Sequence, residues 1–227
     1  MGRLLNGTDG YLRQAHSTQF APDMLPYWVA MRFKRSVSDA PGLSQFLFSH
    51  GNSAGSTLEG VSILLRASSA NVTGRCCDAA SNRASVTSGG AVLDTNWHSV
   101  VVAIDRARGT IRIWLDGTEA GNVAGGAGPT SDSLASVGTI SASNFLGIGR
   151  AENPPGNYYA GTIADLNIGR GVIPTADQIA AFHGGLAGAK AFAGPWLACS
   201  WPLVGDSLSC AVNPAASFAF TPFGTAT

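Results

Sequence analysis

Charged residues are scarce in this sequence, and their scarcity excludes some classes of function. Asp, Glu, Lys and Arg make up 12% of the 227 residues, about half the usual share. The 14 basic residues balance the 14 acidic ones, so the formal net charge is zero. Nucleic-acid binding needs a basic surface that displaces counterions from phosphates. The densest basic stretch holds only Arg32, Lys34 and Arg35, so no nucleic-acid partner is expected.

Long apolar runs are also missing. No segment approaches the roughly 20 apolar residues that a membrane-spanning helix needs, so no membrane insertion is expected. Residues 1–7 (MGRLLNG) lack the apolar stretch and the small-residue cleavage site of a signal peptide. We therefore expect synthesis in the cytoplasm of the producing cell.

The four cysteines lack the spacing of a metal site. Cys76, Cys77, Cys199 and Cys210 form no CxxC pair and no His/Cys cluster with zinc spacing. The adjacent Cys76 and Cys77 would point to opposite faces of a strand. We expect four reduced thiols, and a Cys199–Cys210 bridge across a hairpin is the alternative.

Short strand patterns follow one another along most of the chain. Each is rich in β-branched or aromatic residues and is bounded by Gly, Pro, Asn or Ser. Spacings near ten residues are typical of a sandwich or barrel. No linker interrupts the pattern, so we expect one domain over residues 1–227, with its longest loop at Gly121–Gly138. The candidate strands are Tyr27–Arg35, Leu43–His50, Gly60–Ala67, Asn71–Cys77, Arg83–Thr87, Trp97–Asp105, Thr110–Leu115, Asn144–Ile148 and Gly161–Ile168.

One segment predicts a helix, near residues 175–184. Thr175 and Gln178 have the spacing of a capping box, in which each side chain accepts a hydrogen bond from the other residue's backbone N–H. Ile179 and Phe182 follow as an apolar stripe. Two glycines then end the helix, which we expect to lie against the sandwich.

Several stretches together resemble laminin-G-like jelly rolls of the concanavalin A-like lectin/glucanase superfamily. They are residues 6–12 (NGTDGYL), 97–117 (WHSVVVAIDRARGTIRIWLDG), 159–168 (YAGTIADLNI) and, more weakly, 197–203 (LACSWPL). They follow the order usual in that family. The resemblance implies an all-β fold, an antiparallel jelly-roll β-sandwich. It does not fix the function, because this fold supports lectins, hydrolases, adhesion modules and virion proteins.

The sequence lacks the residue pattern of an enzyme. Glycoside hydrolysis needs two carboxylates about 5–9 Å apart. Hydrolases of this family usually place them on one strand as E-x-D-x-x-E, which is absent here. Asp116 and Glu119 lie at a turn, where Asp116 is expected to stabilise the hairpin. No G-x-S-x-G motif is present. His98 follows Trp97, which we expect in the core, at a position where the family that this chain resembles often carries His, so a structural role is favoured for this histidine.

Sugar binding needs an exposed aromatic face beside a few polar groups. Trp114 is the first candidate because alternation points it away from the apolar residues of its strand, beside Arg112. Core packing is its alternative role. Tyr158 and Tyr159 form a second candidate, and alternation predicts that one of them is buried and the other exposed.

Calcium is the one metal that the resemblance leaves open, because some relatives bind it through loop oxygens. Calcium takes six to eight oxygens, several of them carboxylates. The candidates are Asp9, Asp94 and Asp165, which are far apart in sequence. For Asp165 we favour a structural role, in which it accepts backbone hydrogen bonds at a strand crossing. No cofactor is otherwise expected.

These observations favour a non-enzymatic protein. The main hypothesis is a bacteriophage virion protein, for capsid decoration or associated with the tail, because the surface is low in charge and rich in small residues. Its partners would be other virion proteins and glycans on the host surface, and a homo-oligomer is left open. The alternative is a carbohydrate-binding lectin or adhesion module. A glycoside hydrolase ranks last.

Overall fold

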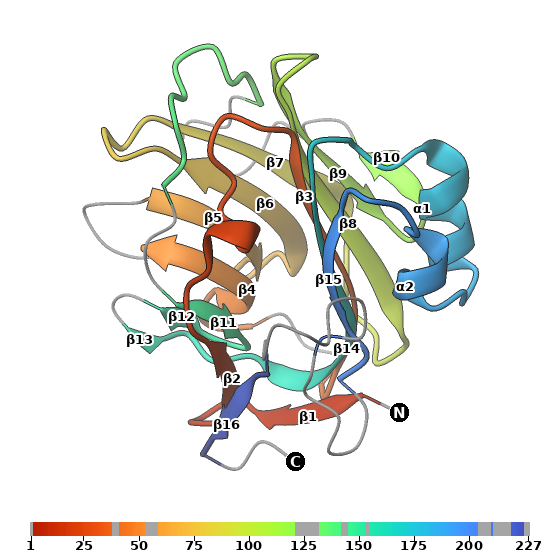
Figure 1. Cartoon of the computed structure of the whole chain (residues 1–227). Helices are drawn as coiled ribbons and strands as arrows, with labels where there is room; N and C mark the ends of the chain where they lie inside the picture. Colours follow the sequence, from red (N-terminus) through yellow and green to blue (C-terminus); the bar gives the residue numbers. More distant parts are fainter. Residues whose placement is uncertain are drawn as a thin grey trace.

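Alternating apolar side chains build two antiparallel sheets that pack face to face (Figure 1). The computed structural model describes residues 2–37, 41–52, 59–120, 132–141, 145–152, 155–203, 210 and 219–224. Each sheet has seven strands, and the strand order confirms the predicted β-sandwich. A two-stranded ribbon, β12 (Ala151–Glu152) with β13 (Pro155–Gly156), accompanies them.

The first sheet, called sheet A, carries the helices on its outer side. Its strands, in spatial order, are β1 (Arg3–Asn6), β14 (Ala160–Arg170), β3 (Tyr27–Arg35), β8 (His98–Asp105), β9 (Thr110–Leu115) and β10 (Thr118–Ala120), with β15 (Leu197–Trp201) paired to β14. The second sheet, called sheet B, is ordered β16 (Thr221–Phe223), β2 (Tyr11–Gln14), β11 (Leu146–Ile148), β4 (Gln45–Asn52), β5 (Glu59–Leu65), β6 (Asn71–Cys77) and β7 (Arg83–Ala91).

The core lies between the inner faces of the two sheets. Val100 and Val102 of β8 and Val61 and Ile63 of β5 are among its fully buried residues. Gly74 of β6 lets the sheets approach closely, because a Cβ atom there would lie 2.7 Å from a methyl carbon of Val102. Burial of this core drives folding, because each CH₂ group removed from water contributes about 0.8 kcal/mol.

The outer face of sheet A has a second apolar layer. Trp28 of β3 and Trp114 of β9 are buried there against α1 (Ala176–His183) and α2 (Gly188–Ala191). Phe192 packs on Trp28 with ring centroids 4.7 Å apart. Figure 1 shows the two helices beside β8, β9 and β15. The helix predicted near residues 175–184 is therefore confirmed, and Thr175 and Gln178 form the predicted capping box.

The bounds of three strands, β3, β6 and β9, are those that the sequence predicts. The other predicted strands differ from the observed ones by a few residues at their ends. A short 3₁₀ helix, Thr18–Phe20, was not predicted. Most of the loop predicted at Gly121–Gly138 lies outside the described residues. In the described part, no helix has the length and apolar character to cross a membrane.

The prediction of four reduced thiols is wrong for one pair. Cys199 of β15 and Cys210 form a disulfide, with Cα atoms 5.7 Å apart, a separation that suits such a bond. The hairpin predicted between them falls mainly outside the described residues. Cys76 and Cys77 are free and buried, and burial raises the pKa of both thiols, to about 12 and about 11. Neither thiol is therefore reactive near neutral pH.

Candidate functional site

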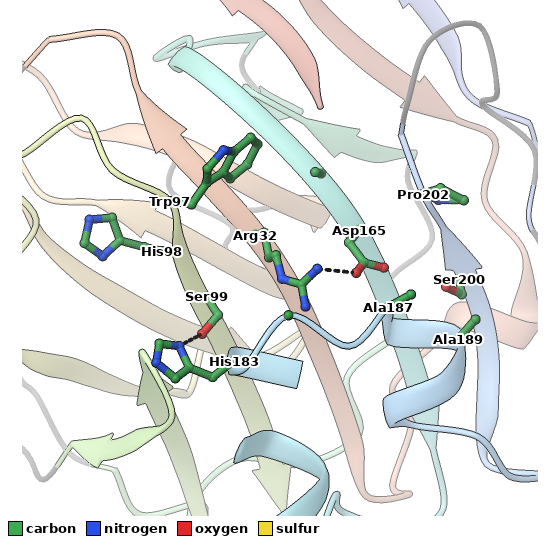
Figure 2. A pocket seen from close by; sticks show the side chains of 12 residues that line it. Arg32, Trp97, His98, Ser99, Asp165, His183, Ala187, Ala189, Ser200 and Pro202 are labelled. Carbon is green, nitrogen blue, oxygen red and sulfur yellow. Dashed lines mark hydrogen bonds and ion pairs between the residues drawn. The ribbon is translucent and has the colours of Figure 1, made fainter. Parts of the chain in front are cut away.

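A pocket of about 490 Å³ opens where the outer face of sheet A meets the segment between α1 and α2 (Figure 2). Alanines and a proline form much of its wall. The polar and aromatic side chains that line it are Arg32, Trp97, His98, Ser99, Asp165, His183 and Ser200.

The floor of the pocket is a row of residues across three strands. Ser99 of β8 pairs in register with Arg32 of β3, which pairs with Ala164 of β14. Arg32 donates hydrogen bonds to the carbonyl oxygens of Phe182 and Leu186, and its guanidinium lies 4.5 Å from the centre of the Phe182 ring. Arg32 thus fastens the end of α1 to the sheet.

Asp165 is the second anchor of the pocket. It lies at a β-bulge of β14 with a φ of 54°, where the register against β3 shifts. Its carboxylate accepts the backbone N–H of Gly188, at the start of α2, and an ion pair from Arg32 at 3.0 Å. Burial is the largest influence on this carboxyl group and raises its pKa. These contacts confirm the predicted structural role of Asp165.

A histidine between two carboxylates borders the pocket. His98 Nδ1 lies 2.7 Å from Asp116 Oδ2, and His98 Nε2 lies 2.9 Å from Asp94 Oδ1. The hydrogen bond with Asp116 is the largest influence on His98 and raises its pKa. Asp116 has a φ of 52° and accepts the backbone N–H of Ser99 at 2.9 Å. The predicted turn role of Asp116 and structural role of His98 are therefore confirmed.

Ser99, His183 and Asp116 have the residue types of a nucleophilic triad but not its arrangement. In a triad, the serine and the carboxylate bind opposite nitrogens of the imidazole ring. Here Ser99 Oγ lies 3.1 Å from His183 Nδ1, and Asp116 Oδ1 lies 3.9 Å from the same nitrogen. Ser99 is also 5% exposed. No carboxylate therefore orients the His183 imidazole from the nitrogen opposite Ser99, as a triad requires.

The sequence profile of the concanavalin A-like lectin/glucanases superfamily (Laminin_G_3) matches residues 6–180. The chain belongs to this superfamily. The match covers β2 to β14 and the first part of α1, and it leaves out β15, β16 and all of β1 except Asn6. No curated protein sequence matches the chain significantly.

Solved structures share the concanavalin A-like fold at low sequence identity. A "putative carbohydrate binding protein" from Bacteroides ovatus ATCC 8483 is 11% identical, with a TM-score of 0.69 over 100% of this chain and 59% of its own. The heptameric SAP-like pentraxin of Limulus polyphemus is 16% identical, with a TM-score of 0.56 over 80% of each chain. The CBM40 of the Ruminococcus gnavus IT-sialidase, bound to alpha2,3 sialyllactose, is 12% identical, with a TM-score of 0.57 over 81% of this chain and 97% of its own. These likenesses show the fold.

Trp97 is the aromatic residue that the sequence analysis misplaced. We expected it in the core of this concanavalin A-like sandwich, but it is 45% exposed and lines the pocket. It directly precedes β8, so the alternation of that strand does not determine which way its ring points. Its ring lies close to Gly2, which directly precedes β1, since a Cβ atom on Gly2 would come 2.9 Å from Trp97 Cη2.

Trp114 has no exposed aromatic face, so it does not have the sugar-binding role that was the first of its two predicted roles. It is 5% exposed and belongs to the apolar layer that includes Phe182, so the core-packing alternative is correct. Arg112 lies 4.4 Å from the centre of the Trp114 ring and forms ion pairs with Glu119 and Asp105. Residues of the helix layer, distant in sequence, bury this face of β9.

Tyr158 and Tyr159 separate as alternation predicts, and neither joins the pocket. Tyr159 is fully buried, and burial raises its pKa. Tyr158 is half-buried, with its ring centroid 6.2 Å from that of Tyr11. Tyr11 stacks on Phe223 at 4.8 Å, and the Arg150 guanidinium lies 3.6 Å from the Tyr11 ring centre. Tyr158 is thus part of an aromatic cluster at the edge of sheet B.

The three aspartates proposed for calcium do not come together. Asp9 hydrogen-bonds Asn6 in the turn between β1 and β2, Asp94 contacts His98, and Asp165 contacts Arg32. Among the described residues, no group of three or more His, Cys, Asp or Glu side chains could hold a metal ion. Each aspartate is instead explained by its local hydrogen bonds.

Proposed function

We propose that this chain is a non-enzymatic carbohydrate-binding module and that the pocket on sheet A takes part of a glycan. The observation that carries the proposal is the half-exposed Trp97 beside the polar groups of a pocket of about 490 Å³. Sugar rings have apolar C–H faces and hydroxylated rims, so they bind an aromatic face flanked by hydrogen-bonding groups. The volume lies within the range of about 300–1,000 Å³ common for small-ligand pockets.

The polar groups of the pocket suit sugar hydroxyls. The His183 imidazole is exposed at the pocket and can both donate and accept hydrogen bonds, whereas Ser99 and Ser200 are nearly buried behind it. The contacts of Arg32 with α1 and Asp165 hold the pocket wall in place before a ligand arrives. Preorganisation of this kind lowers the entropic cost of binding. Two structural neighbours agree with this proposal, because one is described as a putative carbohydrate binding protein and the other is bound to alpha2,3 sialyllactose.

The absence of catalysis is part of the proposal. Asp165 is the one carboxylate among the described residues that line the pocket, and it is paired with Arg32. Glycoside hydrolysis needs a second carboxyl group about 5–9 Å away across the bond to be cleaved. A module that binds without cleaving is the function that such a pocket supports.

A glycan array followed by isothermal titration calorimetry tests the proposal. We expect at least one array glycan to bind, and Trp97→Ala to weaken its binding by about tenfold or more, which corresponds to about 1.4 kcal/mol. Phe145→Ala is the matched control, since Phe145 is an aromatic residue 39% exposed that does not line the pocket. Binding that is unchanged in Trp97→Ala, or that is lost equally in Phe145→Ala, would contradict the assignment of the pocket.

The virion hypothesis stays a prediction from the sequence. Its support is the low share of charged residues, 12%, and its rank falls below carbohydrate binding because the structural neighbours named above include carbohydrate-binding proteins. In a virion, the same pocket would bind glycans on the host surface. Mass spectrometry of purified particles tests this location, and recovery of the protein only in free, secreted form would refute it.

A further inference from the structure

Two histidines that are distant in sequence meet where β2 ends in sheet B. His50 of β4 pairs in register with Leu146 of β11 and with Val61 of β5, and both of these are core residues. Residues paired in register share one face of a sheet, so the His50 side chain points into the sandwich, where it is fully buried. His16 lies two residues after the end of β2 and is exposed. One of the two imidazole rings is therefore open to solvent and the other is not.

The distance between the two rings suits a shared metal ion. His16 Nδ1 lies 3.4 Å from His50 Nε2. Two imidazole nitrogens on one tetrahedral zinc ion, each about 2.0–2.1 Å from the metal, lie about 3.3–3.4 Å from each other. Hydrogen bonds from an N–H group are usually shorter, about 2.7–3.2 Å. The observed spacing therefore fits two ligands of one metal ion better than a well-formed hydrogen bond.

The protonation state of His50 also favours a metal. Burial, and after it the neighbouring His16, lowers the pKa of His50 to about 3. The ring is therefore neutral at physiological pH, and a neutral imidazole keeps a lone pair on one nitrogen. Metal binding to His50 then requires no deprotonation of an imidazolium, which is a cost that other histidines pay as the pH falls.

A buried oxygen without a partner lies on the same inner face. Gln14 of β2 pairs in register with Leu146, as His50 does from the other side of β11, so both side chains point inward (Figure 1). Gln14 is 6% exposed, and its Oε1 has no hydrogen-bond partner in the described part of the chain. Buried polar atoms are nearly always satisfied by protein groups, ions or ordered water. An amide oxygen is a metal ligand, so a cation bound at the two histidines would give this atom a partner.

We propose that His16 Nδ1 and His50 Nε2 bind a divalent transition-metal ion of the zinc or copper class. Imidazole nitrogens suit zinc and copper, whereas calcium and magnesium take oxygen ligands. The exposed side of His16 gives the ion a path from solvent and leaves positions for water. The bound ion would cross-link the segment after β2 to β4. Neither histidine lines the pocket on sheet A, so this proposal does not depend on glycan binding.

Titration calorimetry with zinc chloride, on protein without an affinity tag, tests the site. We expect one zinc ion to bind per chain and magnesium chloride to give no binding. His16→Ala should weaken zinc binding by about tenfold or more. This variant should fold, because His16 is exposed. His183→Ala is the matched control, since His183 is an exposed histidine on the other side of the sandwich.

The copper complex gives a second readout, because pulsed electron paramagnetic resonance counts the imidazole ligands of Cu²⁺. We expect two imidazoles in the wild-type protein and fewer in His16→Ala. Saturating zinc should also raise the melting temperature of the wild-type protein but not that of His16→Ala. Zinc binding that is absent, unchanged in His16→Ala or weakened equally by His183→Ala would overturn the proposal. A wild-type copper spectrum with fewer than two imidazole ligands would overturn it as well.

Discussion

The outer faces of the two sheets differ in whether their partly buried arginines are paired with a carboxylate. On sheet A, helices cover an apolar layer, and Arg32 at its margin is paired with Asp165 and with the carbonyl oxygens at the end of α1. On sheet B, Arg75 is partly buried among like charges without a carboxylate partner in the described structure. Removal of one partner from a buried ion pair is destabilising because it leaves the other charge uncompensated, whereas a cation that has no carboxylate partner leaves none behind. The two faces therefore differ in what the removal of an arginine should do to the free energy of unfolding.

The largest expected effect concerns the two tryptophans on the side of sheet A. Trp114→Ala should lower the free energy of unfolding by about 3–5 kcal/mol, because it leaves a cavity in the layer under α1. Trp97→Ala should change it by less than about 1 kcal/mol, because the Trp97 ring is already 45% exposed. Urea unfolding followed by circular dichroism measures both. Equal losses would mean that Trp97 is also a core residue.

A smaller loss is expected when the anchor of α2 is removed. Asp165→Ala should lower the free energy of unfolding by about 3 kcal/mol, since it leaves the Arg32 guanidinium and the Gly188 N–H without their shared acceptor. Asp177→Ala serves as control, because Asp177 is an exposed acidic residue in the first turn of α1. A loss no larger than that of the control would show that Asp165 does not anchor the helix.

The histidine at the edge of the pocket makes stability depend on pH. The folded-state pKa of His98 is raised, first by its hydrogen bond to Asp116. The contribution of His98 to the free energy of unfolding is therefore complete below the unfolded-state pKa of about 6.5. It is lost as the pH rises through the folded-state pKa. Asp116 has a lowered pKa, held down by His98 and the Ser99 N–H against the effect of burial, so its contribution is lost on acidification.

Unfolding curves measured from about pH 3 to about pH 9 check this dependence. In His98→Gln, the fall in stability above about pH 6.5 should disappear, while the acid limb below about pH 4 should remain in part. His16→Gln is the control, because His16 is an exposed histidine on the side of sheet B. If the alkaline fall persists in His98→Gln, another group is its source.

The sequence predicted those features that depend on local patterns. Alternation gave the bounds of β3, β6 and β9, and a three-residue spacing gave the cap at Thr175. The roles of Trp97 and Trp114 could not be assigned in this way, because they depend on where the segment at Gly2 and the helix layer pack. Pairing of Arg32 with Asp165 joins residues 133 positions apart, so no spacing rule reveals it.

The smallest expected effect contrasts one arginine from each face. Arg112→Ala should lower the free energy of unfolding by about 1 kcal/mol, because Arg112 stacks on Trp114 and pairs with Glu119 and Asp105. Arg75→Ala should leave it unchanged or raise it by a few tenths of a kcal/mol, approximately, because the lost cation has only like-charged neighbours and a thiol around it. Thermal and urea unfolding at low and high salt measure the difference. High salt should reduce the difference in stability between the two variants, because screening weakens both the ion pairs on sheet A and the repulsion on sheet B. A destabilised Arg75→Ala would show that this arginine supports the fold, and the contrast between the two faces would then not hold.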